Sequence, residues 1–154
     1  DFAREQFADL DLPAARLEGQ HRLPEAGQLL VGREAARRLV PPGRGSILFT
    51  GASASLRGKA QFAAFASAKA GLRMVVQSLA REVGPQGIHV AHVVIDGAVN
   101  GEVVKNKVPG IEDRFGSEGM LNVDAIAETF WQLHLQHPTA WTQELDLRPF
   151  KENW

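Results

Sequence analysis

Apolar residues along this chain recur at spacings that predict a small number of regular elements. Between residues 25 and 39 they fall on one side of a helical repeat, with charged residues mostly on the other, which predicts an amphipathic helix. Residues 47–50 form a short apolar run and residues 88–95 a nearly continuous one, as is typical of parallel strands covered on both faces. Residues 59–83 between them predict a long helix, so these elements form a right-handed βαβ unit.

The remainder of the chain predicts one more helix and one more strand. Asn122 is a favourable N-cap for a helix over residues 123–136, and residues 141–147 are typical of a last strand. Residues 98–121 contain several glycines and predict a long irregular segment, which is often a functional lid. Residues 1–22 show only weak helical patterning. The pattern predicts an α/β fold with a small parallel sheet of about three strands and flanking helices.

The first half of the helix predicted over residues 59–83 is rich in small side chains. They let a second helix approach closely, so we expect this helix to be buried between partners. The small residues are Ala60, Ala63, Ala64, Ala66, Ala68, Ala70 and Gly71.

Composition fits one globular domain over residues 1–154, with residues 1–22 as a poorly defined N-terminal segment. The chain is 44% hydrophobic and 23% charged, and its net charge of -1 gives no reason to expect a nucleic-acid or membrane partner. It has no apolar run long enough to span a membrane, and no cysteine for disulfides, thiol nucleophiles or metal ligation. We therefore expect a cytoplasmic protein.

The apolar run at residues 47–50 leads through a small-residue loop into the long helix, an arrangement that places side chains at the end of a strand. Phe65 and Lys69 are four residues apart and so share a face of that helix. The loop around Ser53, Gly-Ala-Ser-Ala-Ser, matches the nucleophile elbow G-x-S-x-G except at its last position, which leaves a serine hydrolase as a minor alternative.

Histidines do not form a metal-binding pattern in this sequence. His89 and His92 are three residues apart on a predicted strand, so they are expected to point to opposite faces. His134 and His137 straddle the end of a predicted helix and are expected at the surface. No metal site is predicted.

The order of these elements resembles a known family. A strand with a TGASAS loop, a helix with F-x-x-x-K, a strand ending in Asp-Gly, a lid-like segment and a last strand resemble the second half of a short-chain dehydrogenase/reductase (SDR). The similarity runs from about Ala26 to the C-terminus and is greatest over residues 78–97. It is closest to a subgroup with Phe at the tyrosine position and an ELDLRP-like ending. The resemblance implies a partial Rossmann-like three-layer fold.

In that family a tyrosine exchanges a proton with the substrate, and a lysine four residues later holds the cofactor ribose and lowers the pKa of the phenol. The resemblance places Phe65 and Lys69 at these positions. The family's serine, which hydrogen-bonds the substrate oxygen, maps to Ala52 with Ser53 next to it, and the asparagine of its proton relay maps to about Pro24. Because a phenyl ring cannot exchange a proton, only Lys69 of these four keeps its role, and the site is degenerate.

The resemblance also implies NAD or NADP as the cofactor. Besides Lys69, the positions that would bind it are Gly97 and Val99. Asp96 stands where the family usually has proline, and Gly101 where it has a threonine that contacts the cofactor. Contacts through the backbone could persist at these positions, whereas the threonine hydroxyl is lost.

A dinucleotide-binding glycine fingerprint follows a strand and opens a helix, and it lies in the first half of the family's fold. The nearest candidate here, Gly43-Arg44-Gly45, follows a predicted helix and precedes a strand. We therefore expect this chain alone not to bind a dinucleotide tightly.

Two classes of function are consistent with these residues. The first is an NAD(P)-dependent oxidoreductase acting on a carbonyl or alcohol, inactive as it stands because Phe65 and Ala52 replace the reactive hydroxyls and the nucleotide-binding half is absent. The second is a non-catalytic scaffold or pseudoenzyme. In both, the resemblance implies a homo-oligomer formed through the helices at residues 25–39 and 59–83.

Overall fold

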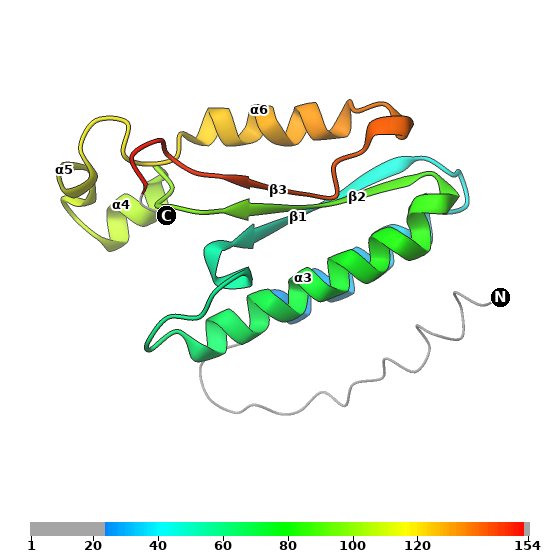
Figure 1. The fold of residues 1–154 in the computed structure, drawn as a ribbon, viewed down its shortest axis with the longest axis horizontal. Coiled ribbons are helices and arrows are strands. Elements are labelled where there is room, and N and C mark those ends of the chain that lie inside the picture. Colours follow the sequence, from blue (N-terminus) through cyan, green and yellow to red (C-terminus); the bar gives the residue numbers. More distant parts are fainter. Residues whose placement is uncertain (1–23, 153–154) are drawn as a thin grey trace.

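The computed structural model describes residues 24–152 of the chain, which form three layers around a small parallel sheet (Figure 1). The strands are β1 (Gly45–Ala52), β2 (Ile88–Ile95) and β3 (Glu144–Leu147). They lie in the order β1-β2-β3, and both neighbouring pairs are parallel, so β1 and β3 are the edges. The predicted α/β fold with a three-stranded parallel sheet is confirmed.

Helices cover both faces of this sheet. Helices α2 (Pro24–Leu39) and α3 (Ala63–Val83) lie on one face, and α6 (Val123–His134) lies on the other (Figure 1). Short elements connect them: η1 (Ser53–Ser55), η2 (Gly84–Gln86), α4 (Glu102–Lys107), α5 (Ile111–Phe115) and η3 (Pro138–Ala140).

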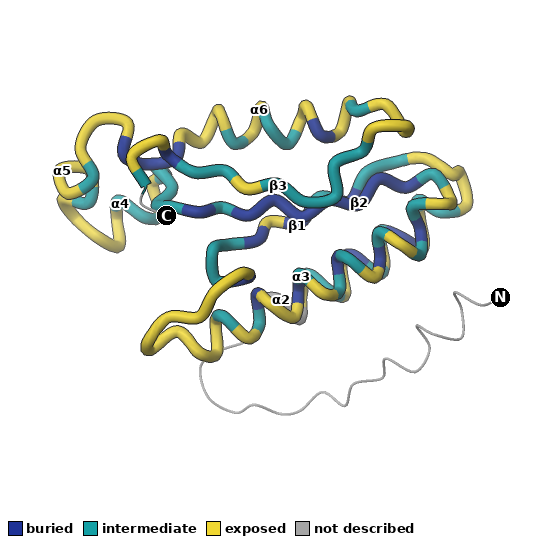
Figure 2. The backbone as a smooth tube through the Cα atoms, in the orientation of Figure 1, coloured by how far each residue is buried: buried dark blue, intermediate teal, exposed yellow. Residues whose placement is uncertain are grey.

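Strand β2 is the centre of the molecule, and Figure 2 shows it as the longest continuous buried segment. All of its residues except the last are buried, which agrees with the apolar run that predicts it at residues 88–95. Its neighbours on both sides complete a ladder that removes its backbone from water. The largest cluster of buried side chains joins this strand to β1, α2 and α3; it consists of Ala36, Ile47, Phe49, Leu72, Val76, Leu79, Val83, Ile88 and Val90.

Helix α3 begins at Ala63, so the prediction that it starts at residue 59 is wrong. A turn precedes it, in which the Phe62 N–H donates to the Lys59 carbonyl at 3.0 Å. Gln61 within this turn has a φ of 69°, in the left-handed region, and a right-handed helix cannot pass through such a residue.

The later elements also differ from their predicted bounds. Strand β3 begins at Glu144 rather than at residue 141, because the Trp141 indole donates to the Gln136 carbonyl at 3.2 Å and its ring stacks on His89 instead of entering the strand. Helix α6 ends at His134 rather than at residue 136. The segment predicted to be irregular, residues 98–121, contains the short helices α4 and α5.

The small-residue face of α3 is not buried within the described chain. Ala63, Ala70 and Gly71 are exposed, whereas the side of the helix that carries Leu72 and Val76 packs on the sheet. Within the described chain only one side of this helix is covered, and its burial between partners stays a prediction.

None of the helices in the described part of the chain is long and apolar enough to cross a membrane. The segment predicted to be poorly defined, residues 1–22, lies outside the described residues, and the single domain over residues 1–154 stays a prediction.

Candidate functional site

The carboxyl ends of β1 and β2 lie side by side, because the parallel register pairs Ala52 with Ile95. At this edge of a parallel sheet the loops leave the strands together, and ligands of open α/β sheets bind there. The loop after β1 turns at once into η1, where the Ala52 N–H donates to the Ser55 hydroxyl at 3.2 Å. Asp96 and Gly97 follow β2 at the same edge.

Phe65 and Lys69 lie on the first turns of α3, facing these strand ends. The Lys69 ammonium donates to the Thr50 carbonyl at 3.2 Å, and Lys69 is buried. The same ammonium lies 5.9 Å from the centre of the Phe65 ring, which is 43% exposed. The shared helix face predicted for the two residues thus brings a cation and an aromatic ring together at the end of β1.

Asp96 forms an ion-pair cluster that ties three segments together. Its side chain is 3% exposed, and it accepts from Nη2 of Arg57 at 3.1 and 3.3 Å and from Nη2 of Arg148 at 2.6 Å. Arg57 follows η1, and Arg148 follows β3. A buried carboxylate is costly unless it is paired and hydrogen-bonded, and here two guanidinium groups satisfy it.

Behind the strand ends lies a second polar network, formed by His92, Glu144 and Arg73. Arg73 donates to both oxygens of Glu144, at 2.7 and 2.6 Å, and Nδ1 of His92 lies 2.9 Å from Oε2 of the same carboxylate. Because a carboxylate only accepts, Nδ1 of His92 carries the proton. A Cβ on Gly51 would overlap the His92 ring, so the strand that carries the site packs directly on this network.

Burial lowers the pKa of His92, whereas the neighbouring Glu144 carboxylate raises it. Its desolvation, together with the nearby charges of Arg73 and Lys69, outweighs the Glu144 carboxylate, so the pKa of His92 lies below its usual value and the neutral imidazole is favoured. For Glu144, the hydrogen bonds from Arg73 hold the pKa of the carboxyl below its usual value. The network is therefore a carboxylate shared between a guanidinium and a neutral imidazole.

Two cavities open near this edge of the sheet. One, of about 410 Å³, adjoins Phe65; its lining residues are Ser53, Ala54, Arg57, Gly58, Lys59, Phe62, Phe65, Asp96, Gly97 and Glu152.

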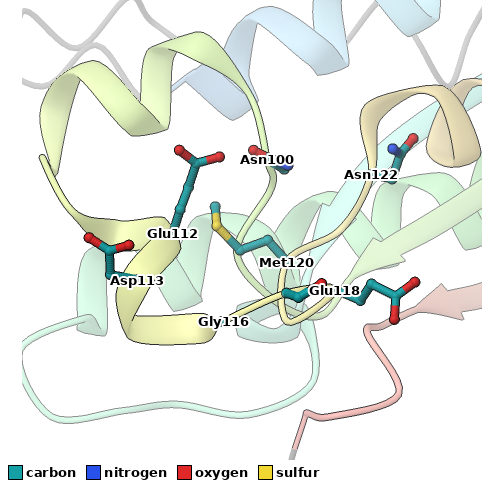
Figure 3. A pocket seen from close by; sticks show the side chains of 8 residues that line it. Asn100, Glu112, Asp113, Gly116, Glu118, Met120 and Asn122 are labelled. Carbon is teal, nitrogen blue, oxygen red and sulfur yellow. The ribbon is translucent and has the colours of Figure 1, made fainter.

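The larger cavity, about 730 Å³, is formed by the segment predicted to be a lid together with the start of α6. Figure 3 shows the carboxylates of Glu112 and Asp113, from α5, on one side of Met120 and the amide of Asn122 on the other. This cavity is acidic, whereas the cavity beside Phe65 is bordered by Arg57 and Lys59.

The structure brings together some of the residues expected at the site. Ser53, Phe65 and Gly97 line the smaller cavity. Ala52 instead pairs with Ile95 in the sheet, and Val99 forms an isolated bridge with Leu121. The roles of these residues toward substrate and cofactor stay predictions, as does the role of Pro24, which is the first residue of α2.

The prediction that His89 and His92 point to opposite faces is confirmed. The ring of His89 stacks on Trp141 with centres 4.9 Å apart, whereas His92 bonds to Glu144. Among residues 24–152, no group of three or more histidines, aspartates and glutamates is placed to hold a metal ion.

Sequence reasoning missed the partners of Asp96. Arg57 is 39 residues before it and Arg148 is 52 residues after it, so no local pattern joins them. The available signal was an aspartate directly after a strand buried on both faces, because such a carboxylate needs a cation nearby.

Comparison with known proteins agrees with the fold. The family model for short chain dehydrogenase matches residues 23–111, and no match to a curated protein was found. Together with the parallel sheet and the helices on both of its faces, this match defines an α/β fold of the Rossmann-like type. The chain belongs to the short-chain dehydrogenase/reductase family.

Solved structures share this fold. A short-chain dehydrogenase from Rhodopseudomonas palustris is 44% identical, with a TM-score of 0.61 over 80% of this chain and 47% of that one. A serine dehydrogenase complexed with NADP+ is 17% identical, with a TM-score of 0.72 over 83% of this chain and 53% of that one. A 7α-hydroxysteroid dehydrogenase complexed with NADH and a steroid is 21% identical, with a TM-score of 0.66 over 80% of this chain and 50% of that one. The chain thus spans about half the length of the structures it matches.

Proposed function

We propose that this chain forms the substrate-facing part of a nicotinamide-dependent oxidoreductase site of the SDR type, and that it does not catalyse hydride transfer by itself. The observation that carries this proposal is the pair of Phe65 and Lys69. The ring lines the cavity at the strand ends and the ammonium lies 5.9 Å from its centre, so the cation is retained beside a group that has no proton to exchange.

The described residues fit one end of a dinucleotide. The Lys69 ammonium reaches the end of β1, where it would hold the ribose hydroxyls, and Gly97 lines the adjoining cavity. The segment Gly43-Arg44-Gly45 lies at the amino end of β1, whereas cofactors of such sheets bind beyond the carboxyl ends. Within residues 24–152 it is therefore wrongly placed to cradle a pyrophosphate.

A bound nicotinamide would supply the hydride donor or acceptor, and the chain itself would position the substrate. The Ser53 hydroxyl would donate to the substrate oxygen, since Ala52 cannot, and Phe65 would give the cavity an apolar wall. Loss of a general acid and of an oxyanion donor each costs on the order of a hundredfold or more in rate. The combined loss accounts for the proposed lack of turnover.

Calorimetric titration with NADH and with NADPH, together with a hydride-transfer assay, tests this proposal. We expect neither tight nucleotide binding nor measurable turnover by this chain alone. Micromolar binding of either nucleotide would show that a complete nucleotide site exists. A robust hydride-transfer rate that Lys69→Ala abolishes would overturn the proposed inactivity.

A second candidate function, a non-catalytic homo-oligomeric scaffold, is favoured by the exposed faces of α2 and α3. Leu30 and Val31 on α2 are 54% and 69% exposed, and Met74 on α3 is 50% exposed beside the small residues Ala70 and Gly71. Large apolar side chains next to small ones suit close helix packing between copies. Light scattering at micromolar concentration tests this function, and a strictly monomeric mass would contradict it.

A further inference from the structure

The cavity beside Phe65 combines aromatic walls with cations. Phe62 and Phe65 line it, and both rings are partly exposed, at 49% and 43%. The Lys59 ammonium lies 5.9 Å from the centre of the Phe62 ring, and that of Lys69 lies equally far from the Phe65 ring. An apolar group that enters this cavity would therefore pack against rings while remaining close to positive charge.

Arg57 is the cation best placed to recognise an anion in this cavity. Its side chain is 53% exposed, and both of its contacts with Asp96 use the same nitrogen, Nη2. Its Nη1 and Nε donate to no other group in the described part of the chain. A guanidinium with donors to spare offers the planar geometry that a carboxylate accepts through both oxygens.

The side chains that line this cavity carry equal numbers of positive and negative charges, with Arg57 and Lys59 against Asp96 and Glu152. The two carboxylates that line it belong to Asp96 and Glu152. Asp96 is already neutralised by Arg148, through the shorter of its ion pairs at 2.6 Å. Arg57 is therefore not the sole counter-charge of Asp96, and its Nη1 and Nε are left to receive an anionic ligand.

We propose that the substrate of this site carries a carboxylate attached to an aromatic or unsaturated apolar body. Arg57 binds the carboxylate, and the rings of Phe62 and Phe65 hold the apolar body in the cavity of about 410 Å³. This assignment rests on the proposed function, because it makes the cavity beside Lys69 the substrate pocket of that oxidoreductase site.

The test compares an acid with its neutral amide of nearly the same shape, without nucleotide. Phenylacetate and phenylacetamide are titrated into the full chain and followed by ligand-observed NMR. For molecules this small we expect phenylacetate to bind with a dissociation constant of roughly millimolar size. We expect phenylacetamide to bind about tenfold more weakly, because it cannot form charge-assisted hydrogen bonds with Arg57.

Variants locate the interaction. Arg57→Gln is expected to weaken phenylacetate about tenfold and to leave phenylacetamide unchanged. Arg148 still pairs with Asp96 in this variant, so no buried carboxylate is left without a partner. Arg44→Gln, in the exposed turn at the other end of β1, is the matched control and should change neither ligand. Arg57→Lys keeps the charge without the planar fork and should fall between the wild type and Arg57→Gln.

Equal binding of the acid and the amide to the wild-type chain would overturn the proposal, and this comparison depends on no variant. Unchanged phenylacetate affinity in Arg57→Gln would also overturn it. The nucleotide titration and turnover assay are separate: micromolar nucleotide binding or turnover alongside carboxylate selectivity refutes the proposed function alone. If the chain neither binds nucleotide at micromolar concentration nor turns over, and it also binds the acid and the amide equally, then only the proposed substrate class is refuted.

Discussion

At the scale of single residues, the site is held together by carboxylates that are shielded from water and paired with cations. Asp96 follows β2 at the carboxyl edge of the sheet and Glu144 begins β3, and each of these carboxylates is held by a guanidinium group. The difference lies in the third member of each cluster. Asp96 has a second arginine, which stays charged, whereas Glu144 has His92, whose charge depends on pH.

His92 should make the stability of the protein depend on pH. Its pKa in the folded state lies below the usual value of 6.5, so the folded state binds fewer protons than the unfolded state. The free energy of unfolding should therefore be highest above pH 6.5, fall as the pH decreases through that value, and level off below the folded-state pKa. Urea denaturation between about pH 8 and pH 5 measures this dependence.

The control for this prediction is His92→Gln. Its amide can still donate to Glu144 but does not titrate, so the slope of stability against pH should be smaller than in the wild type. The pKa of Glu144 lies below its usual value of 4.5, so its contribution is lost only at lower pH. The same slope in both proteins would show that His92 is not the titrating group.

How far sequence predicts this site is clear from particular residues. Phe65, Ser53 and Gly97 were predicted because they occupy local positions, on one helix face or at a strand end, and the structure places all three at one cavity. The partnership of Asp96 with Arg57 and Arg148 was not predicted, because it depends on how the loop after β1 and the tail after β3 meet. The contact between these two segments is set by the tertiary fold and not by any local sequence pattern.

At the scale of elements, the sequence predicts the interior of a strand or helix better than it predicts the residue at which the element begins. Strand β2 has its predicted bounds because a nearly continuous apolar run is best accommodated in the middle of the sheet. The start of α3 depends instead on the left-handed conformation of Gln61, which its residue type does not indicate. The start of β3 depends on Trp141, which stacks on His89 and therefore lies outside the strand.

Helix α6 offers a direct test of how the second face of the sheet is held. Leu133 is 2% exposed, whereas Leu135, at the end of the helix, is 56% exposed. Leu133→Ala should lower the free energy of unfolding by about 2–5 kcal/mol, because it removes apolar contacts and leaves a cavity. Leu135→Ala should change it by no more than about 0.5 kcal/mol. Urea denaturation of both variants measures the difference, and equal losses would mean that α6 is not packed as described.

At the scale of the whole molecule, the exposed faces of α2 and α3 raise the question of assembly. The stripe on α3 includes Ala70, Gly71 and Met74, which are all exposed. It lies opposite the side that packs on β1 and β2, so a second copy could cover it without disturbing the core. Helix packing of this kind needs small residues at the point of closest approach.

Gly71→Arg should separate assembly from folding. A Cβ at this position meets nothing within 4 Å, and arginine favours a helix more than glycine does, so the fold should tolerate the change. A long charged side chain in the stripe should nevertheless prevent a second helix from approaching, and light scattering should report a monomer. Ala127→Arg, at an exposed position of α6, is the control and should leave the mass unchanged. An unaltered mass for Gly71→Arg would exclude this stripe as the interface.

The place of β1 at the border of the sheet gives the molecule another way to associate. Within residues 24–152 this eight-residue strand pairs with β2 on one side, so its other side presents main-chain donors and acceptors. A strand from a second molecule could add there and extend the sheet from one molecule to the next. Such growth relies on the polypeptide backbone rather than on chosen side chains. It is therefore distinct from the closed homo-oligomer that Gly71→Arg tests, because it favours open-ended aggregates over closed particles.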